Sequence, residues 1–191
     1  METPSGIRGR GAGFNPAQRF AELRVDYDPG EAPEKIATKF LRDHSSSIIS
    51  KNSSPDLPFE ASLNPYRGCE HGCVYCFARP SHAWLGMSPG LDFESKLFFK
   101  PEAARLLEAE LSKPRYKPGY IHIGGNTDPY QPQERTTGLT RQIIDVLGRF
   151  NHPFSIITKS ALILRDLDLL APWPSRTSCG WRSRSPPSTG P

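Results

Sequence analysis

The most constraining feature of this sequence is a cluster of three cysteines. Cys69, Cys73 and Cys76 lie within eight residues at C-x3-C-x2-C spacing and make up three of the four cysteines in the chain. Such short gaps let successive sulfurs converge on one soft metal centre, usually an iron–sulfur cubane or zinc. Both centres normally take four protein ligands. The loop therefore leaves one corner of a metal centre without a cysteine.

Three cysteines at this spacing, followed by the aromatic Phe77, resemble the cluster motif of the radical S-adenosylmethionine (SAM) superfamily. The resemblance implies a [4Fe–4S] cluster whose fourth iron is chelated by the amino and carboxylate groups of SAM. It also implies an enzyme that reductively cleaves SAM to methionine and a 5′-deoxyadenosyl radical.

The same loop allows an alternative of a different class. A zinc site could recruit His71 or His82 as its fourth ligand, in a zinc- or nucleic-acid-binding module without catalysis. Zinc loops usually carry C-x2-C pairs, which this loop does not repeat. A disulfide is disfavoured because three clustered cysteines cannot pair evenly.

Charge and hydropathy bound the class of protein. The net charge is +4, but residues 172–191 contain three arginines and no acid, so the rest of the chain has 21 basic and 20 acidic side chains. A positively charged DNA-binding surface would spread over the folded part, so the charge distribution gives no support for DNA binding.

The sequence has no apolar run of about 18 residues and no apolar signal core at its N-terminus. We therefore expect no membrane insertion and a cytoplasmic protein with reduced thiols.

The order of patterns along the chain predicts an α/β fold. Residues 1–58 are rich in glycine and proline and predict a flexible arm and leader, with a short helix over 16–23. Residues 59–171 form the predicted core, in which strands alternate with amphipathic helices. The predicted strands are 61–65, 120–123 and 154–158, and the predicted helices are 101–111, 137–150 and 160–170. Ser160 is the predicted N-terminal cap of the last helix. Such alternation builds a parallel sheet, with the cysteine loop at its carboxyl edge.

Within the radical SAM resemblance, this order corresponds to a partial (β/α) barrel of which only about the first three strand–helix units are present. The family's glycine-rich loop corresponds to Gly124–Asp128, where Asp128 would accept from the SAM ammonium. Lys159 would neutralise the SAM carboxylate, and Ser160 would donate a hydrogen bond. The plain alternatives are a turn at Asn126–Pro129 and a solvated lysine.

A wider resemblance runs from about Gly9 to about Pro172. The stretches NPYRGCxHxCxYCFARPSH, T-D-x-Y-Q-P-x-E and I-T-K-S resemble bacterial radical SAM proteins related to spore photoproduct lyase. The resemblance implies a site of cluster ligands and SAM-contacting residues: Cys69, Cys73, Cys76, Tyr75, Gly125, Asn126, Thr127, Asp128, Lys159 and Ser160. It also implies an electron donor such as flavodoxin or ferredoxin, and nucleic acid as one candidate substrate.

The repair activity of the lyase does not carry over. Its radical-quenching cysteine corresponds to Gly125 here, and the resembling region has no cysteine outside the triad. The substrate therefore stays open.

The last twenty residues differ in composition from the rest. Residues 172–191 are mainly Pro, Ser and Arg and contain no Leu, Ile, Val or Phe, so we expect an aberrant disordered tail without a fourth strand. Because every residue type there has GC-rich codons, one interpretation is a frameshift that removed the rest of the barrel. The resulting chain would be a lyase-like fragment of low stability and little SAM cleavage. The other interpretation is a natural Pro/Ser/Arg tail.

Overall fold

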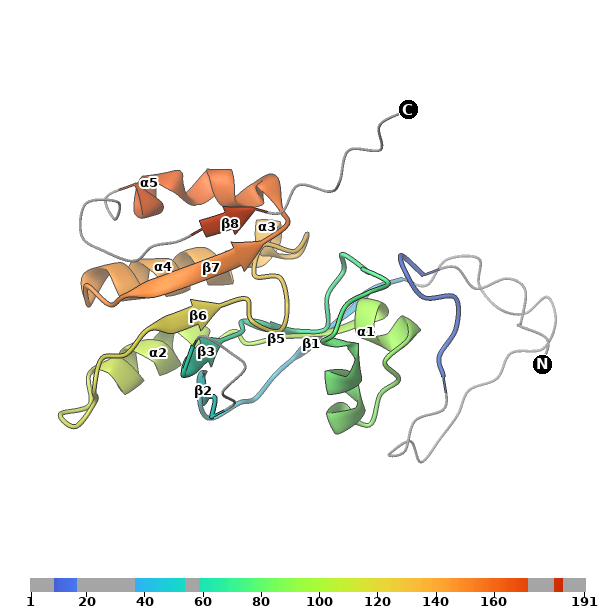
Figure 1. The fold of residues 1–191 in the computed structure, drawn as a ribbon, viewed down its shortest axis with the longest axis horizontal. Coiled ribbons are helices and arrows are strands. Elements are labelled where there is room, and N and C mark those ends of the chain that lie inside the picture. The colour runs from blue at the N-terminus through green and yellow to red at the C-terminus, as the bar shows by residue number, and fades with distance from the viewer. Residues whose placement is uncertain (1–8, 17–36, 54–58, 172–180, 184–191) are drawn as a thin grey trace. The chain divides into compact units, whose positions relative to one another are not determined.

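The structure, a computed structural model, describes residues 9–16, 37–53, 59–171 and 181–183 (Figure 1). The chain divides into two compact units. Unit 1 contains Met1–Asp43 and Tyr66–Phe99, and unit 2 contains His44–Pro65 and Lys100–Pro191.

Unit 1 is built on a three-stranded sheet. Its strands are β1 (Lys39–Arg42), β4 (Tyr66–Arg67) and β5 (Lys96–Phe99), in the order β1-β5-β4. β5 is parallel to β1 and antiparallel to β4. The 3-10 helix η1 (Arg79–Leu85) and the short helix α1 (Leu91–Ser95) lie between β4 and β5 in the chain.

A glycine ends the 3-10 helix of unit 1. Gly86 ends η1 in the left-handed region with φ of 69°, and its N–H reaches the carbonyls of Ala83 and His82. A left-handed residue with such bonds is a common helix terminator, and glycine adopts it without steric cost. α1 has no exposed face, because all five of its residues are buried, including Leu91 and Phe93.

Unit 2 is built on a five-stranded sheet in the order β2-β3-β6-β7-β8. Its strands are β2 (Ile49–Lys51), β3 (Ala61–Leu63), β6 (Ile121–Ile123), β7 (Phe154–Thr158) and β8 (Trp181–Ser183). β2 pairs antiparallel with β3, whereas β3, β6, β7 and β8 are all parallel.

Helices cover one face of this sheet. They are α2 (Ala103–Leu111), α3 (Glu134–Thr137), α4 (Leu139–Arg149), the 3-10 helix η2 (Ala161–Asp166) and α5 (Leu167–Leu170). α2 and α4 pack on the sheet through apolar residues at helical spacing, including Leu107, Ile143 and Leu147, which are fully buried. Burial of each such side chain contributes about 1.5–3 kcal/mol to the free energy of folding. The strand residues on the face that packs against these helices include Leu63 and Ile156, which belong to the same core cluster.

The predicted α/β class is confirmed, and the three predicted strands and helices of the core match β3, β6, β7, α2, α4 and η2–α5. Ser160 caps η2 as predicted, because its hydroxyl accepts the Leu162 N–H at 3.2 Å. In the described residues the strands form two open sheets and no closed barrel. The barrel of the radical SAM type therefore stays a proposal.

Several elements were not predicted. β1 and β2 lie within the segment expected to be a flexible leader. α1 and β5 lie between the predicted strand 61–65 and the predicted helix 101–111, where no element was expected. The expectation of no strand after Ala171 was wrong, because the backbone of Trp181–Ser183 pairs with β7. Strand pairing uses backbone groups, so a short edge strand does not require an apolar sequence.

Two expectations cannot be compared with the structure. Residues 17–23 of the predicted short helix lie outside the described residues, as do 172–180 and 184–191 of the predicted tail. None of the helices in the described part of the chain has the length and apolar character needed to span a bilayer.

Candidate functional site

The three clustered cysteines lie on a tightly turned loop in unit 1. None of the three cysteines forms a disulfide; Cys69 is buried, and Cys73 and Cys76 are half-buried. The Cys69 N–H donates to the Phe93 carbonyl at 2.9 Å, which ties the loop to α1. Turns then bring the Gly72 N–H to the Cys69 carbonyl at 3.4 Å and the Cys76 N–H to the Cys73 carbonyl at 3.2 Å. Cys69 and Cys76 share one small apolar cluster.

Two glycines in this loop have conformations that other residues rarely adopt. Gly68 has φ of 76°, and a Cβ there would lie 2.8 Å from the Phe93 carbonyl oxygen. Gly72 has φ of 59°, and a Cβ there would lie 2.3 Å from both Arg10 Cβ and Glu94 Oε2. Both positions therefore require glycine for backbone conformation and for space.

Large apolar side chains beside the cysteines are exposed. Tyr75 is 78% exposed, Phe77 79% and Trp84, on η1, 81%. Tyr75, which was expected to lie beside a bound cluster, is thus accessible to a ligand.

The cysteine loop fits a soft metal centre by its donor type, because three thiols within eight residues are the ligands of iron–sulfur clusters and of zinc. Cys69, Cys73 and Cys76 are the residues that would hold it. The side chains of the described residues form no group of three His, Cys, Asp or Glu arranged around one metal position.

His82, a candidate fourth ligand, is buried behind the loop. Its Nε2 lies 2.9 Å from the Lys96 carbonyl oxygen, which can only accept, so Nε2 carries the proton. Its Nδ1 is buried without a hydrogen-bond partner. Burial lowers the pKa of His82, which keeps the ring neutral. His71, the other candidate, is half-buried.

The second group of predicted residues lies in unit 2, where side chains tie the carboxyl ends of three parallel strands together. Asn64 follows β3, and its Oδ1 accepts the N–H groups of Asn126 at 2.9 Å and Thr127 at 3.3 Å in the loop after β6. The Gly124 N–H donates to the Leu63 carbonyl at 3.2 Å. The glycine-rich loop is therefore fixed against β3.

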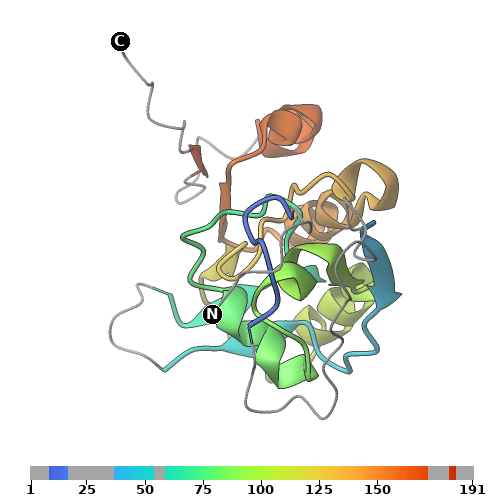
Figure 2. The ribbon, with the colours of Figure 1, turned by 90° about the vertical axis from the view of Figure 1, so that its right-hand side faces the viewer.

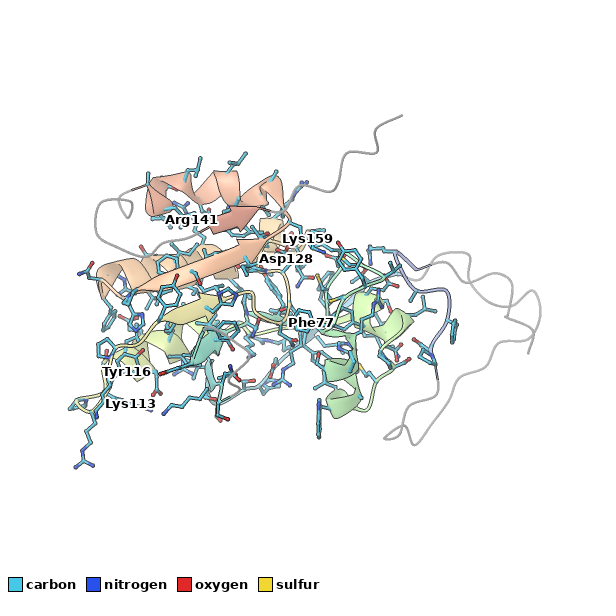
Figure 3. The ribbon with its side chains drawn as sticks, in the orientation of Figure 1. Phe77, Lys113, Tyr116, Asp128, Arg141 and Lys159 are labelled. Carbon is cyan, nitrogen blue, oxygen red and sulfur yellow. The ribbon has the colours of Figure 1, made fainter. Side chains whose placement is uncertain are left out.

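Asp128 connects the same loop to β7 (Figure 3). Its carboxylate accepts the Thr158 hydroxyl at 2.7 Å, the Lys159 N–H at 2.8 Å and the Tyr130 N–H at 2.8 Å. The Ser160 N–H in turn donates to the Thr158 hydroxyl at 3.0 Å.

Six of the ten predicted site residues thus gather at these strand ends, namely Gly125, Asn126, Thr127, Asp128, Lys159 and Ser160. The other four, Cys69, Cys73, Tyr75 and Cys76, belong to unit 1. Lys159 is exposed, whereas Thr127 is buried. Asp128 and Ser160 already hold structural bonds, so their local role is to shape the site.

A polar row on the sheet face opposite the helices of unit 2 was not predicted from the sequence. Ser62, His122 and Ser155 are register partners on β3, β6 and β7. His122 Nδ1 lies 2.7 Å from Ser155 Oγ, and its ring stacks on Phe59 with centroids 4.5 Å apart. Burial lowers the pKa of His122. A single polar residue between two apolar ones in each strand was the signal that could have revealed this row.

Gly125 lies beside this row. A Cβ at Gly125 would lie 3.2 Å from His122 Cδ2 and 3.4 Å from Phe59 Cζ. Gly125 is therefore packed closely against the imidazole ring of His122.

The chain matches relatives over part of its length. It is 44% identical over 115 residues to the uncharacterized protein Rv2578c of Mycobacterium tuberculosis, a match that covers 60% of this chain and 34% of that protein. It is 33% identical over 107 residues to the uncharacterized protein MJ0683 of Methanocaldococcus jannaschii, over 56% of this chain and 38% of that protein. The chain thus spans between 34% and 38% of the length of these relatives. No protein-family model and no solved structure matches it.

Proposed function

We propose that this chain carries the first part of a radical SAM core and that Cys69, Cys73 and Cys76 hold a [4Fe–4S] cluster. The observation that carries the proposal is the set of three cysteine thiols within eight residues, one fewer than a closed site requires. When bound, such a cluster supplies the electron that cleaves SAM to a 5′-deoxyadenosyl radical. The proposal includes a flavodoxin or ferredoxin as electron donor.

The strand ends of unit 2 support this proposal through their chemistry. Asp128 fixes the backbone of Lys159, so the exposed lysine amino group is presented from a rigid strand end. A lysine ammonium there is suited to bind the carboxylate of SAM as a point charge. The backbone around Gly125 permits close approach by a ligand, because glycine has no side chain. Tyr75 adds an exposed aromatic ring that can stack on a planar group.

The substrate is proposed only by class. Nucleic acid is one candidate because of the resemblance to spore photoproduct lyase, but the chain outside 172–191 is nearly neutral. Gly125 stands where the lyase has its cysteine, so the proposal does not include lesion repair.

Anaerobic reconstitution with iron and sulfide tests the proposal. We expect about four iron and four sulfide per chain, the content of one cubane, and loss of both in Cys73→Ala. Cys179→Ala is the matched control, because this fourth cysteine lies outside the triad and should leave iron and sulfide unchanged. Stoichiometric zinc with no iron in the reconstituted chain would rule the cluster out.

One observation favours a zinc site as a second candidate. His82 donates its Nε2 proton to a backbone carbonyl and leaves Nδ1 unprotonated, which is the usual state of a zinc-bound histidine. A zinc site would use His82 with the three cysteines, so His82→Asn should release zinc. With a [4Fe–4S] cluster, His82→Asn should keep all the iron. His152→Asn is a control of similar burial in unit 2.

A further inference from the structure

Residues 9–16, named the N-terminal strap here, pack beside η1 and α1 of unit 1 (Figures 1 and 2). The strap contains three glycines at alternate positions, Gly9, Gly11 and Gly13. The proposed function gives this segment no role. Its contacts nevertheless converge on the loop that carries the cysteines.

A buried carboxylate anchors the strap. Glu94 on α1 is only 1% exposed, and its side chain accepts the N–H groups of Gly11 at 2.8 Å and Ala12 at 2.7 Å. The Arg10 side chain donates to the Glu94 carbonyl at 2.7 Å. Asn15 adds a second anchor, because its side chain exchanges two hydrogen bonds of 3.0 Å with Asp92. Hydrogen bonds to a buried charge are among the stronger ones in proteins.

The strap crosses the cysteine loop at a contact between two glycines. A Cβ on Gly11 would lie 1.6 Å from the carbonyl oxygen of Gly72, which directly precedes Cys73. Because that contact is with backbone, no side chain can rotate to relieve it. Gly13 differs, since a Cβ there would have no atom within 4 Å.

The same carboxylate is linked to the cysteine loop through Arg79. Arg79 Nη2 lies 3.7 Å from Glu94 Oε2, and the guanidinium donates through Nε to the Cys73 carbonyl at 3.1 Å. Its Nη1 donates to the carbonyls of Pro89 and Gly90 before α1. Glu94 therefore holds the strap on one side and, through Arg79, the backbone of Cys73 on the other.

We propose that the N-terminal strap sets the conformation of the cysteine loop, with Glu94 and Arg79 as its positioning residues. The strap packs against the backbone of Gly72, and the Glu94–Arg79 pair fixes the Cys73 carbonyl. The loop therefore has its metal-binding conformation before metal binds. This inference rests on the proposed function only in taking the cysteines as metal ligands.

The test compares Gly11→Ala with Gly13→Ala in the full-length, reduced, metal-free chain. The rate at which N-ethylmaleimide labels Cys69, resolved by peptide mass spectrometry, reports opening of the loop, because this residue is only 7% exposed. We expect labelling in Gly11→Ala to be about tenfold faster, the change that corresponds to 1.4 kcal/mol. Gly13→Ala should match the wild type.

Iron content after anaerobic reconstitution, well below the unfolding temperature, is the second readout. Gly11→Ala should bind less iron than Gly13→Ala at equal folded fraction, a difference that loss of general stability would not produce. Glu94→Gln keeps a hydrogen-bond acceptor for the strap but loses the charge facing Arg79. Its iron content should therefore lie between that of the wild type and that of Glu94→Ala. If Gly11→Ala does not fold, Asn15→Ala is the milder variant, because it removes only the hydrogen bonds that anchor the strap to Asp92. We expect it to label Cys69 several-fold faster than the wild type does.

Equal labelling and equal iron content in Gly11→Ala and Gly13→Ala, with Asn15→Ala also like wild type, would overturn the inference. If the wild type takes up no iron, the proposed function fails. The difference in the Cys69 labelling rate between Gly11→Ala and Gly13→Ala would then still show whether the strap sets the conformation of the loop.

Discussion

Asp128 accepts the hydroxyl of Thr158 at 2.7 Å, so one side chain from the loop after β6 holds the end of β7. The same carboxylate accepts the N–H of Lys159, the next residue along. Asp128 was predicted as a ligand contact, and the structure gives it a local structural role. A candidate ligand site built this way is rigid before any ligand arrives, which lowers the entropy cost of binding.

Replacement of Asp128 by alanine is expected to destabilise unit 2 by about 2–4 kcal/mol. The variant leaves the Thr158 hydroxyl and two backbone N–H groups without their acceptor, and Thr158 is only 3% exposed. Urea unfolding followed by circular dichroism measures the change. Asp145→Ala is the control, because this exposed aspartate on α4 makes a surface ion pair with Arg149. Equal losses in the two variants would contradict the assigned role of Asp128.

Replacement of Lys159 by alanine is expected to separate binding from folding. Lys159 is exposed, so its truncation should change the unfolding free energy by no more than about 0.5 kcal/mol. If its ammonium binds the SAM carboxylate, the SAM dissociation constant of the reconstituted chain should rise about tenfold. Equilibrium dialysis with labelled SAM measures it, and Lys113→Ala, at an exposed position after α2, should bind SAM normally. Unchanged SAM binding in Lys159→Ala would remove this residue from the proposed site.

The elements of unit 2 that could be predicted from the sequence are those in which the spacing of apolar residues matches the residues that are buried in the structure. β6 and β7 are short apolar runs bounded by breakers, and α4 has its apolar residues at helical spacing. Capping by Ser160 followed from its place directly before η2. Parallel pairing followed from the alternation of strands and helices.

The parts that the sequence did not predict depend on long-range contacts. β5 and β1 pair across more than fifty residues, and neither alternates polar and apolar residues clearly. The strap appeared to be a flexible arm because glycines suggest disorder, yet Gly11 is required by close contact with Gly72. Glu94 gave no signal, since a buried carboxylate cannot be told from an exposed one in a short helix. Buried polar partners become visible only once the chain is folded.

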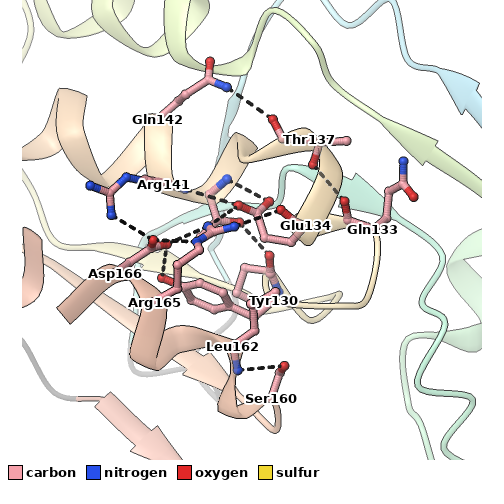
Figure 4. A network of polar contacts seen from close by, with 12 residues as sticks. Tyr130, Gln133, Glu134, Thr137, Arg141, Gln142, Ser160, Leu162, Arg165 and Asp166 are labelled. Carbon is pink, nitrogen blue, oxygen red and sulfur yellow. Dashed lines mark hydrogen bonds and ion pairs between the residues drawn. The ribbon is translucent and has the colours of Figure 1, made fainter. Parts of the chain in front are cut away.

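Removal of the Arg165 guanidinium is expected to destabilise unit 2 by about 3 kcal/mol, at the lower end of the cost of breaking a buried ion pair. Arg165 bonds the buried carboxylates of Glu134 at 2.9 Å and Asp166 at 2.7 Å (Figure 4). Burial alone would raise the pKa of Asp166, but hydrogen bonds from Arg165 and Arg141 outweigh it and lower the pKa. Asp166 keeps Arg141 at 3.0 Å in the variant, which limits the loss.

The measurement compares Arg165→Met with Arg149→Met by urea unfolding. Arg149 pairs with Glu108, but both side chains are about half exposed and solvent screens the pair, so its removal should change the stability little. Similar stabilities in these two variants would show that the network of Figure 4 contributes nothing beyond a surface ion pair.

The stability of unit 2 is expected to fall as pH drops below neutrality, in part because of His152. Burial lowers the pKa of His152 below its ordinary 6.5, and its Nε2 lies 2.7 Å from the Tyr116 hydroxyl. Between the lowered pKa and 6.5, the unfolded chain binds more protons than the folded one, so stability is full above 6.5 and declines with acidification. One histidine can contribute a slope of at most about 1.4 kcal/mol per pH unit.

His152→Gln tests this contribution, because a glutamine oxygen can still accept from Tyr116 but does not titrate in this range. Urea unfolding at several pH values between 5 and 7.5 (flanking the ordinary histidine pKa) gives the slope for each protein. The variant should lose less stability on acidification than the wild type, even if it is less stable at neutral pH. His122, which also lies in unit 2, has a pKa lowered by burial as well, so part of the slope should remain in the variant. A slope as steep as that of the wild type would mean that His152 accepts its proton equally well in the folded and unfolded chains.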